Sequence, residues 1–77
     1  MKLEYLILTT SGPAVGEATV NDRDEACDAL EAAVKDAFGD KHTEDHTVAV
    51  RSICRELRAS ELPFSFRTTA VTVTLKP

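Results

Sequence analysis

The sequence predicts a small α+β domain, in which one amphipathic helix packs on a mostly antiparallel sheet. Three observations predict this fold class: two strand-like segments around an early turn signal, a long apolar stripe of helical period, and alternating apolar residues near the end. A chain of 77 residues makes a single domain. The expected order is strand, strand, helix, then a strand or a second short helix, then a final strand.

The first strand is expected over residues 3–10. Its apolar side chains divide between two faces: Leu3, Tyr5 and Ile7 on one, Leu6 and Leu8 on the other. Apolar residues on both faces are typical of a central strand, or of a strand whose second face meets another subunit. Ser-Gly-Pro at 11–13 is a turn signal, and residues 15–20 predict a second strand, so the two form a β-hairpin.

A helix is predicted over residues 22–38. Asp22 followed by Glu25 has the spacing of a capping box, and Gly39 supplies the left-handed residue that commonly ends a helix. The apolar stripe of this helix consists of Ala26, Cys27, Leu30, Ala33, Val34, Ala37 and Phe38. The opposite face is acidic and carries Asp24, Asp28, Glu31 and Asp36.

The segment after a polar loop at 40–46 is ambiguous. The β-branched run at 47–50 favours a strand, whereas Val50, Ile53, Cys54 and Leu57 match a helical template. The favoured interpretation is a short strand running into a short helix at about 50–58, and the alternative is a long β-hairpin with residues 64–75. In the helical interpretation one polar stripe carries Arg51, Arg55 and Arg58.

One long final strand is expected over residues 64–75. Phe64 and Phe66 alternate on one parity, and Val71, Val73 and Leu75 alternate on the other. The change of parity between residues 67 and 70 predicts a bulge or a bend within that strand.

The charge of the chain is unevenly distributed. Residues 1–45 hold eleven acids against four Lys or Arg, a net charge of −7, whereas residues 46–77 hold two against five, a net of +3. A net acidic protein is poorly suited to direct nucleic-acid binding, because phosphate contacts need a basic surface. The balance favours a protein partner that is itself basic.

Catalysis, metal binding and membrane insertion find little support in the sequence. Cys27 and Cys54 are expected to be reduced, buried thiols, with a disulfide or redox pair as the alternative. His42 and His46 are four residues apart among acids, but they fall in the predicted loop, so no metal site is expected. No nucleophile motif, phosphate loop, cofactor motif or membrane-length apolar run occurs. A non-enzymatic, cytoplasmic protein is therefore expected, since the start also lacks a signal-peptide pattern.

Three candidate surfaces follow from these patterns. The acidic helix face would dock on a basic protein surface, or would be an ordinary solvated face. The arginine stripe would contact a partner, or would pair with acids of the first helix. Leu6 and Leu8 would lie in a homodimer interface if the second helix leaves that face of the sheet uncovered.

The segments EYLILTT, SGP, VGEATV and NDRDEACDALEAAVKDAF, within residues 4–38, resemble in layout the small proteins of phages and mobile elements. Anti-CRISPR proteins are one such group. The resemblance implies a non-catalytic inhibitor that binds a CRISPR effector or another nucleic-acid-binding protein complex of the host cell. The group shares no common functional residues, so the resemblance assigns no site.

The order strand, helix, strand, strand also resembles the dodecin-type flavin-binding shells. Such shells hold flavin by stacking it on aromatic residues, but this chain has no tryptophan, so no flavin is expected. This second resemblance implies, as the alternative function, a structural homo-oligomer without a bound ligand. A generic interaction module is the other alternative.

Overall fold

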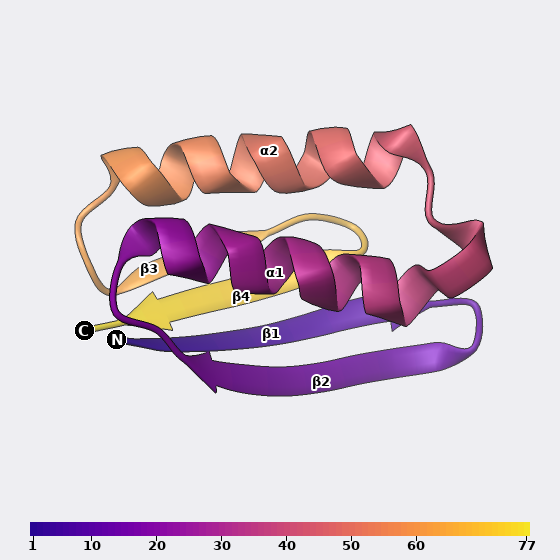
Figure 1. Ribbon diagram of the computed structural model, residues 1–77, viewed down its shortest axis with the longest axis horizontal. Helices are drawn as coiled ribbons and strands as arrows, with labels where there is room; N and C mark the ends of the chain where they lie inside the picture. Colours follow the sequence, from indigo (N-terminus) through magenta and orange to yellow (C-terminus); the bar gives the residue numbers. More distant parts are fainter.

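The computed structural model describes residues 1–77, and it confirms the α+β class. Two helices cover one face of a four-stranded antiparallel sheet, as Figure 1 shows. The elements in chain order are β1 (Lys2–Thr9), β2 (Gly12–Thr19), α1 (Arg23–Phe38), a short 3₁₀ turn η1 (Gly39–Lys41), α2 (Glu44–Ala59), β3 (Phe64–Arg67) and β4 (Val71–Lys76).

The strands lie in the order β2-β1-β4-β3. The two inner strands therefore come from opposite ends of the chain, and Lys2 of β1 lies opposite Lys76 of β4. The first hairpin pairs Leu6 with Val15, and the second pairs Phe64 with Leu75. Because side chains alternate along a strand, this register gives the sheet one face toward the helices and one open face.

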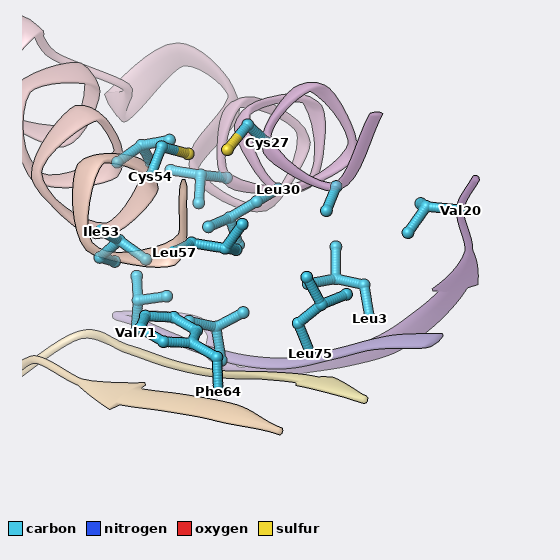
Figure 2. Close-up of a cluster of buried hydrophobic side chains, with 14 of the residues drawn as sticks. Leu3, Val20, Cys27, Leu30, Ile53, Cys54, Leu57, Phe64, Val71 and Leu75 are labelled. Atoms are coloured by element: carbon cyan, nitrogen blue, oxygen red, sulfur yellow. The ribbon is translucent and has the colours of Figure 1, made fainter. Parts of the chain in front are cut away.

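The core lies between the sheet and the helices. Its fully buried side chains come from both layers, as the close-up of Figure 2 shows for several of them. The helices supply Leu30, Val34, Ile53 and Leu57, and the inner strands supply Leu3, Ile7, Val73 and Leu75. No side-chain nitrogen or oxygen atom is buried without a hydrogen-bond partner.

Helix α1 begins and ends where the sequence predicts. The carboxylate of Asp22 accepts a hydrogen bond of 2.8 Å from the backbone N–H of Glu25, and the Glu25 carboxylate accepts one of 2.8 Å from Asn21. Gly39 ends the helix with a φ of 54°, and its N–H bonds back to the carbonyl of Lys35. Neither α1 nor α2 has the length and apolarity that a membrane span requires.

The prediction of a strand at 47–50 after a polar loop was wrong. Helix α2 begins at Glu44 and runs without interruption to Ala59, so the predicted helix at 50–58 is only its second half. Burial decides the outcome: Val50, Ile53, Cys54 and Leu57 form one buried stripe, while the β-branched Val48 stays exposed. Packing of this stripe outweighs the weak β-propensity of the first residues.

The prediction of one long final strand over residues 64–75 was also wrong, because residues 64–76 form the hairpin of β3 and β4. Thr68 builds the turn: its hydroxyl accepts hydrogen bonds from the N–H groups of Ala70 and Val71, and its own N–H donates to the Val71 carbonyl at 2.7 Å. The change of parity in the sequence is therefore a reversal of the chain. Both phenylalanines and the three apolar residues of β4 face the helices.

Candidate functional site

A groove runs between the two helices, and both of the predicted charged surfaces meet in it. Helix α1 contributes Cys27, Asp28 and Glu31, and helix α2 contributes Thr47, Val50, Arg51, Cys54, Arg55 and Arg58. The groove has a volume of about 430 Å³. One wall is thus acidic and the other is basic, with apolar and thiol side chains between them.

Two of the four acids of α1 already have partners within the protein. Asp24 accepts a hydrogen bond of 3.0 Å from Nε of Arg58 across the helix pair, and this bond raises the pKa of that guanidinium. Glu31 pairs with Lys35 one turn further along α1, with 3.4 Å between Nζ and Oε1. Asp28 and Asp36 are exposed and make no ion pair, and Asp36 lies outside the groove.

The arginine stripe lies as the helical interpretation predicts. Arg51, Arg55 and Arg58 all face the groove, but only Arg58 is ion-paired with an acid of the first helix. An exposed pair of this kind contributes little, under about 1 kcal/mol. Arg51 and Arg55 therefore keep their hydrogen-bond donors available on one wall of the groove.

The two cysteines lie together between the helices. Figure 2 shows the sulfur atoms of Cys27 and Cys54 pointing toward one another from α1 and α2, and both thiols are free. Burial, together with a hydrogen bond and charge repulsion from Cys27, raises the pKa of Cys54 to about 12. Cys54 therefore holds its proton at neutral pH, and no histidine lines the groove to remove it.

This shift predicts a specific pH dependence of stability. In the unfolded chain the Cys54 thiol ionises near 9.0, whereas in the folded protein it does so near 12. The unfolded state alone loses this proton between those values, so rising pH favours unfolding. Urea unfolding should show that the wild type loses more stability than Cys54→Ala between about pH 9 and 12. Parallel pH profiles of the two proteins would contradict the shift.

The two histidines make contacts within the protein near the start of α2. The ring of His46 stacks on the ring of Phe38, with 3.9 Å between the ring centroids. The ring centroid of His42 lies 5.5 Å from that of His46. Nδ1 of His46 accepts a hydrogen bond of 3.0 Å from the backbone N–H of Thr43. No three His, Cys, Asp or Glu side chains gather in a way that could hold a metal ion.

His46 is therefore expected to stabilise the start of α2. Replacing it with alanine removes the acceptor for the Thr43 N–H and the stacking partner of Phe38, which should cost about 1 kcal/mol. His42→Ala is the matched control, because His42 makes no hydrogen bond through its side chain, and His46→Glu should restore the acceptor. Urea unfolding of the three variants measures this order, and an equal loss for both alanine variants would contradict it.

The open face of the sheet is the third candidate surface. The second helix lies on the same side of the sheet as the first, so no layer covers Leu6 and Leu8. This is the condition under which the sequence predicted an interface at these two residues. Leu8 is 49% exposed, and Val15 of the neighbouring strand, opposite Leu6, is 77% exposed. Two exposed ion pairs, Lys2–Glu17 and Glu4–Lys76, occupy the other end of this face.

Sequence reasoning missed two residues, Val15 on the open face of the sheet and Arg23 at the start of α1. Val15 had a usable signal, because a two-residue hairpin turn places it opposite Leu6. Arg23 had none: its guanidinium donates to the carbonyls of Leu57 and Ser60, which are distant in the sequence.

No protein-family model, curated protein or solved structure matches this chain.

Proposed function

We propose that the protein is a non-catalytic inhibitor or adaptor that docks on a basic, nucleic-acid-binding protein of the host cytoplasm. The charge of α1 and of the segment leading into α2 supports this proposal, whereas the rest of α2 carries Arg51, Arg55 and Arg58 against Glu56. Residues 22–45 hold nine acids against three basic residues, a net charge of −6, and eight of the nine acids are exposed. The strands β1 to β4 together carry two acids and three basic residues, a net of +1.

The acidic surface consists of Asp24, Asp28, Glu31 and Asp36 on α1. Asp28 and Asp36 are the two members that make no ion pair within the protein, so they are the residues that a partner's arginines or lysines would contact first. Complementary charge accelerates encounter and fixes orientation more than it adds affinity. Arg51 and Arg55 on the opposite groove wall would then donate hydrogen bonds to carbonyl or carboxylate oxygens of the same partner.

An enzymatic function has less support. A nucleophile needs a base held in position by a third group, but the groove thiols lie among acids and arginines without a histidine. The carboxylates are mostly exposed, which leaves them ionised and solvated. A CRISPR effector is the first target to test, because the layout of residues 4–38 resembles anti-CRISPR proteins.

Charge reversal tests the acidic surface directly. We expect Asp28→Lys with Asp36→Lys to abolish retention of a basic nucleoprotein when the tagged protein is incubated with bacterial lysate at low salt and analysed by mass spectrometry. The matched control is Glu56→Lys with Glu61→Lys, which changes the net charge equally and also breaks no ion pair.

The comparison separates a docking surface from a general charge effect. Retention by the wild type and the control, but not by the α1 variant, supports the proposal, and added DNA should compete with the bait for the retained protein. Equal behaviour of all three baits would mean that the acidic surface only confers solubility. Circular dichroism of each variant checks that the helices are intact.

A homodimer is the second candidate function, favoured by the apolar patch of Leu6, Leu8 and Val15. The ion pairs on the same face offset their own charges, so two copies could meet face to face with little repulsion. The strands have eight, eight, four and six residues, so the sheet face covers at most about 420 Å². Burying both faces would then remove about 850 Å², which is below the usual size of specific interfaces and predicts at most a weak dimer.

Sedimentation at increasing protein concentration tests this candidate. The wild type should shift toward a dimer, and the double variant Leu8→Thr with Val15→Thr should remain monomeric. Val48→Thr is the matched control, because Val48 is 51% exposed but lies on α2. A wild-type protein that stays monomeric at the highest concentration would exclude the dimer.

A further inference from the structure

The two thiols of the groove form a pair that neither proposed function uses. Cys27 and Cys54 come from different helices, and their sulfur atoms point toward one another in Figure 2. Both thiols are free, and both residues line the same groove between the helices. A molecule the size of a peroxide can therefore approach them from solvent although each residue is about 95% buried.

We propose that Cys27 and Cys54 are a dithiol site, which a hydroperoxide oxidises to an intramolecular disulfide between α1 and α2. The inference goes beyond the proposed function and does not depend on any partner. Redox-sensitive cysteines typically lie in electropositive surroundings, next to a second cysteine that can resolve the first oxidation product. The groove supplies the second cysteine, and it supplies positive charge from Arg51, Arg55 and Arg58 on one wall, opposite Asp28 and Glu31 on the other.

Arg58 supplies the positive charge. Its guanidinium lines the groove beside the two sulfur atoms, and the Asp24 carboxylate holds it in position through a bond of 3.0 Å. The hydrogen bond to Asp24 raises the pKa of Arg58 most, and charge interactions with Cys27 and Cys54 raise it further. A thiolate formed in the groove therefore has a cation beside it.

The two cysteines have different roles in the reaction. Because burial raises the pKa of Cys54, we assign the first attack to the other thiol of the pair, Cys27. The Cys27 thiolate forms a bond to one peroxide oxygen, the O–O bond breaks, and the leaving alkoxide takes the proton that Cys27 released. The Cys54 sulfur then attacks the sulfur of the Cys27 sulfenic acid, the S–O bond breaks, and water leaves with the Cys54 proton. Two thiols are oxidised, and the hydroperoxide is reduced to an alcohol and water.

The disulfide would join the two walls of the groove covalently. It closes a loop of chain that contains most of α1, the turn η1 and more than half of α2. Such a crosslink restricts the unfolded chain and so stabilises the helical layer. The oxidised protein should therefore melt at a higher temperature than the reduced protein, and a dithiol reductant should reverse the difference.

Oxidation of the folded wild-type protein with hydrogen peroxide tests the site. After alkylation of free thiols and digestion with trypsin, we expect peptides 24–35 and 52–55 to appear as one disulfide-linked species, with both thiols lost together. The pair should form in the folded protein faster than in protein unfolded in urea. Slower formation in the folded protein, or oxidation of one thiol to a sulfinic acid without a crosslink, would overturn the proposal.

Single variants test the order of reaction without requiring the crosslink. Cys54→Ser should accumulate a sulfenic acid at Cys27 that a cyclic dione reagent captures, whereas Cys27→Ser should react at least tenfold more slowly. Cys54→Ala and Cys27→Ala repeat the comparison if a serine variant loses helical signal. Faster capture in the Cys27 variants would overturn the assignment of Cys27 as the attacking thiol.

Discussion

Replacing Leu30 with alanine is expected to lower the free energy of unfolding by about 3 kcal/mol. Leu30 is fully buried at the centre of the core, where Figure 2 shows it between the helices and the sheet, near Leu57. Truncation removes apolar surface from the core and leaves a cavity that two helices and a sheet cannot all move to fill. A domain of this length has a total stability of only about 4–12 kcal/mol, so the loss is a large fraction of it.

Urea unfolding followed by circular dichroism measures this loss. Val48→Ala on α2 is the control, because Val48 is half exposed, and its truncation should change stability by less than about 0.5 kcal/mol. Similar losses for the two variants would mean that the helices do not pack on the sheet as described.

Arg23→Ala is expected to cost about 2 kcal/mol, the largest effect of any charged residue. Nη1 of Arg23 donates to the carbonyl of Leu57 at 2.5 Å and to that of Ser60 at 2.6 Å. Both carbonyls belong to the C-terminal end of α2, where a positive charge also interacts favourably with the helix dipole. Removing a charged donor loses both bonds and leaves two partly buried acceptors to be solvated by water.

Arg55→Ala is the matched control, since Arg55 lies on the same helix pair but makes no hydrogen bond or ion pair. It should change the free energy of unfolding by less than about 0.5 kcal/mol. Arg23→Lys should retain part of the stability, because an ammonium keeps a charged donor at this end of α2 but is more strongly hydrated than a guanidinium. A loss for Arg55→Ala as large as that for Arg23→Ala would show that only net charge matters.

The sequence predicted best where a single local rule was sufficient. Helix α1 has an acidic cap, an uninterrupted apolar stripe and a terminal glycine, and the structure confirms its extent to within one residue at each end. The two faces of β1 were also predicted correctly, because the alternation of side chains is intrinsic to a strand.

Prediction failed where distant packing decided between local alternatives. Thr47 and Val48 favour a strand by themselves, but α2 forms because residues further along it are buried against α1 and the sheet. The turn at Thr68 depends on hydrogen bonds of its own hydroxyl, which a change of parity alone does not reveal. A bulge and a hairpin turn both change the parity of the alternating apolar residues, so the sequence pattern does not distinguish them.

The candidate site illustrates the same limit. Each helix face could be described from its own periodicity, so the acids, the arginines and the two cysteines were all identified beforehand. Their meeting in one groove could not be predicted, because it depends on how α1 and α2 are rotated toward each other. The partial pairing of the two surfaces, through Asp24 and Arg58, follows from that rotation.

The position of β4 inside the sheet has a consequence for folding. This strand lies far from β1 in the sequence, yet it inserts between β1 and β3 and supplies buried side chains beneath the helices. Until β4 is paired, the chain exposes the apolar side of β1 and of both helices, together with one unpaired backbone edge. A substitution that prevents β4 from pairing should therefore yield an aggregation-prone chain that chaperones retain, and not a slightly loosened native domain.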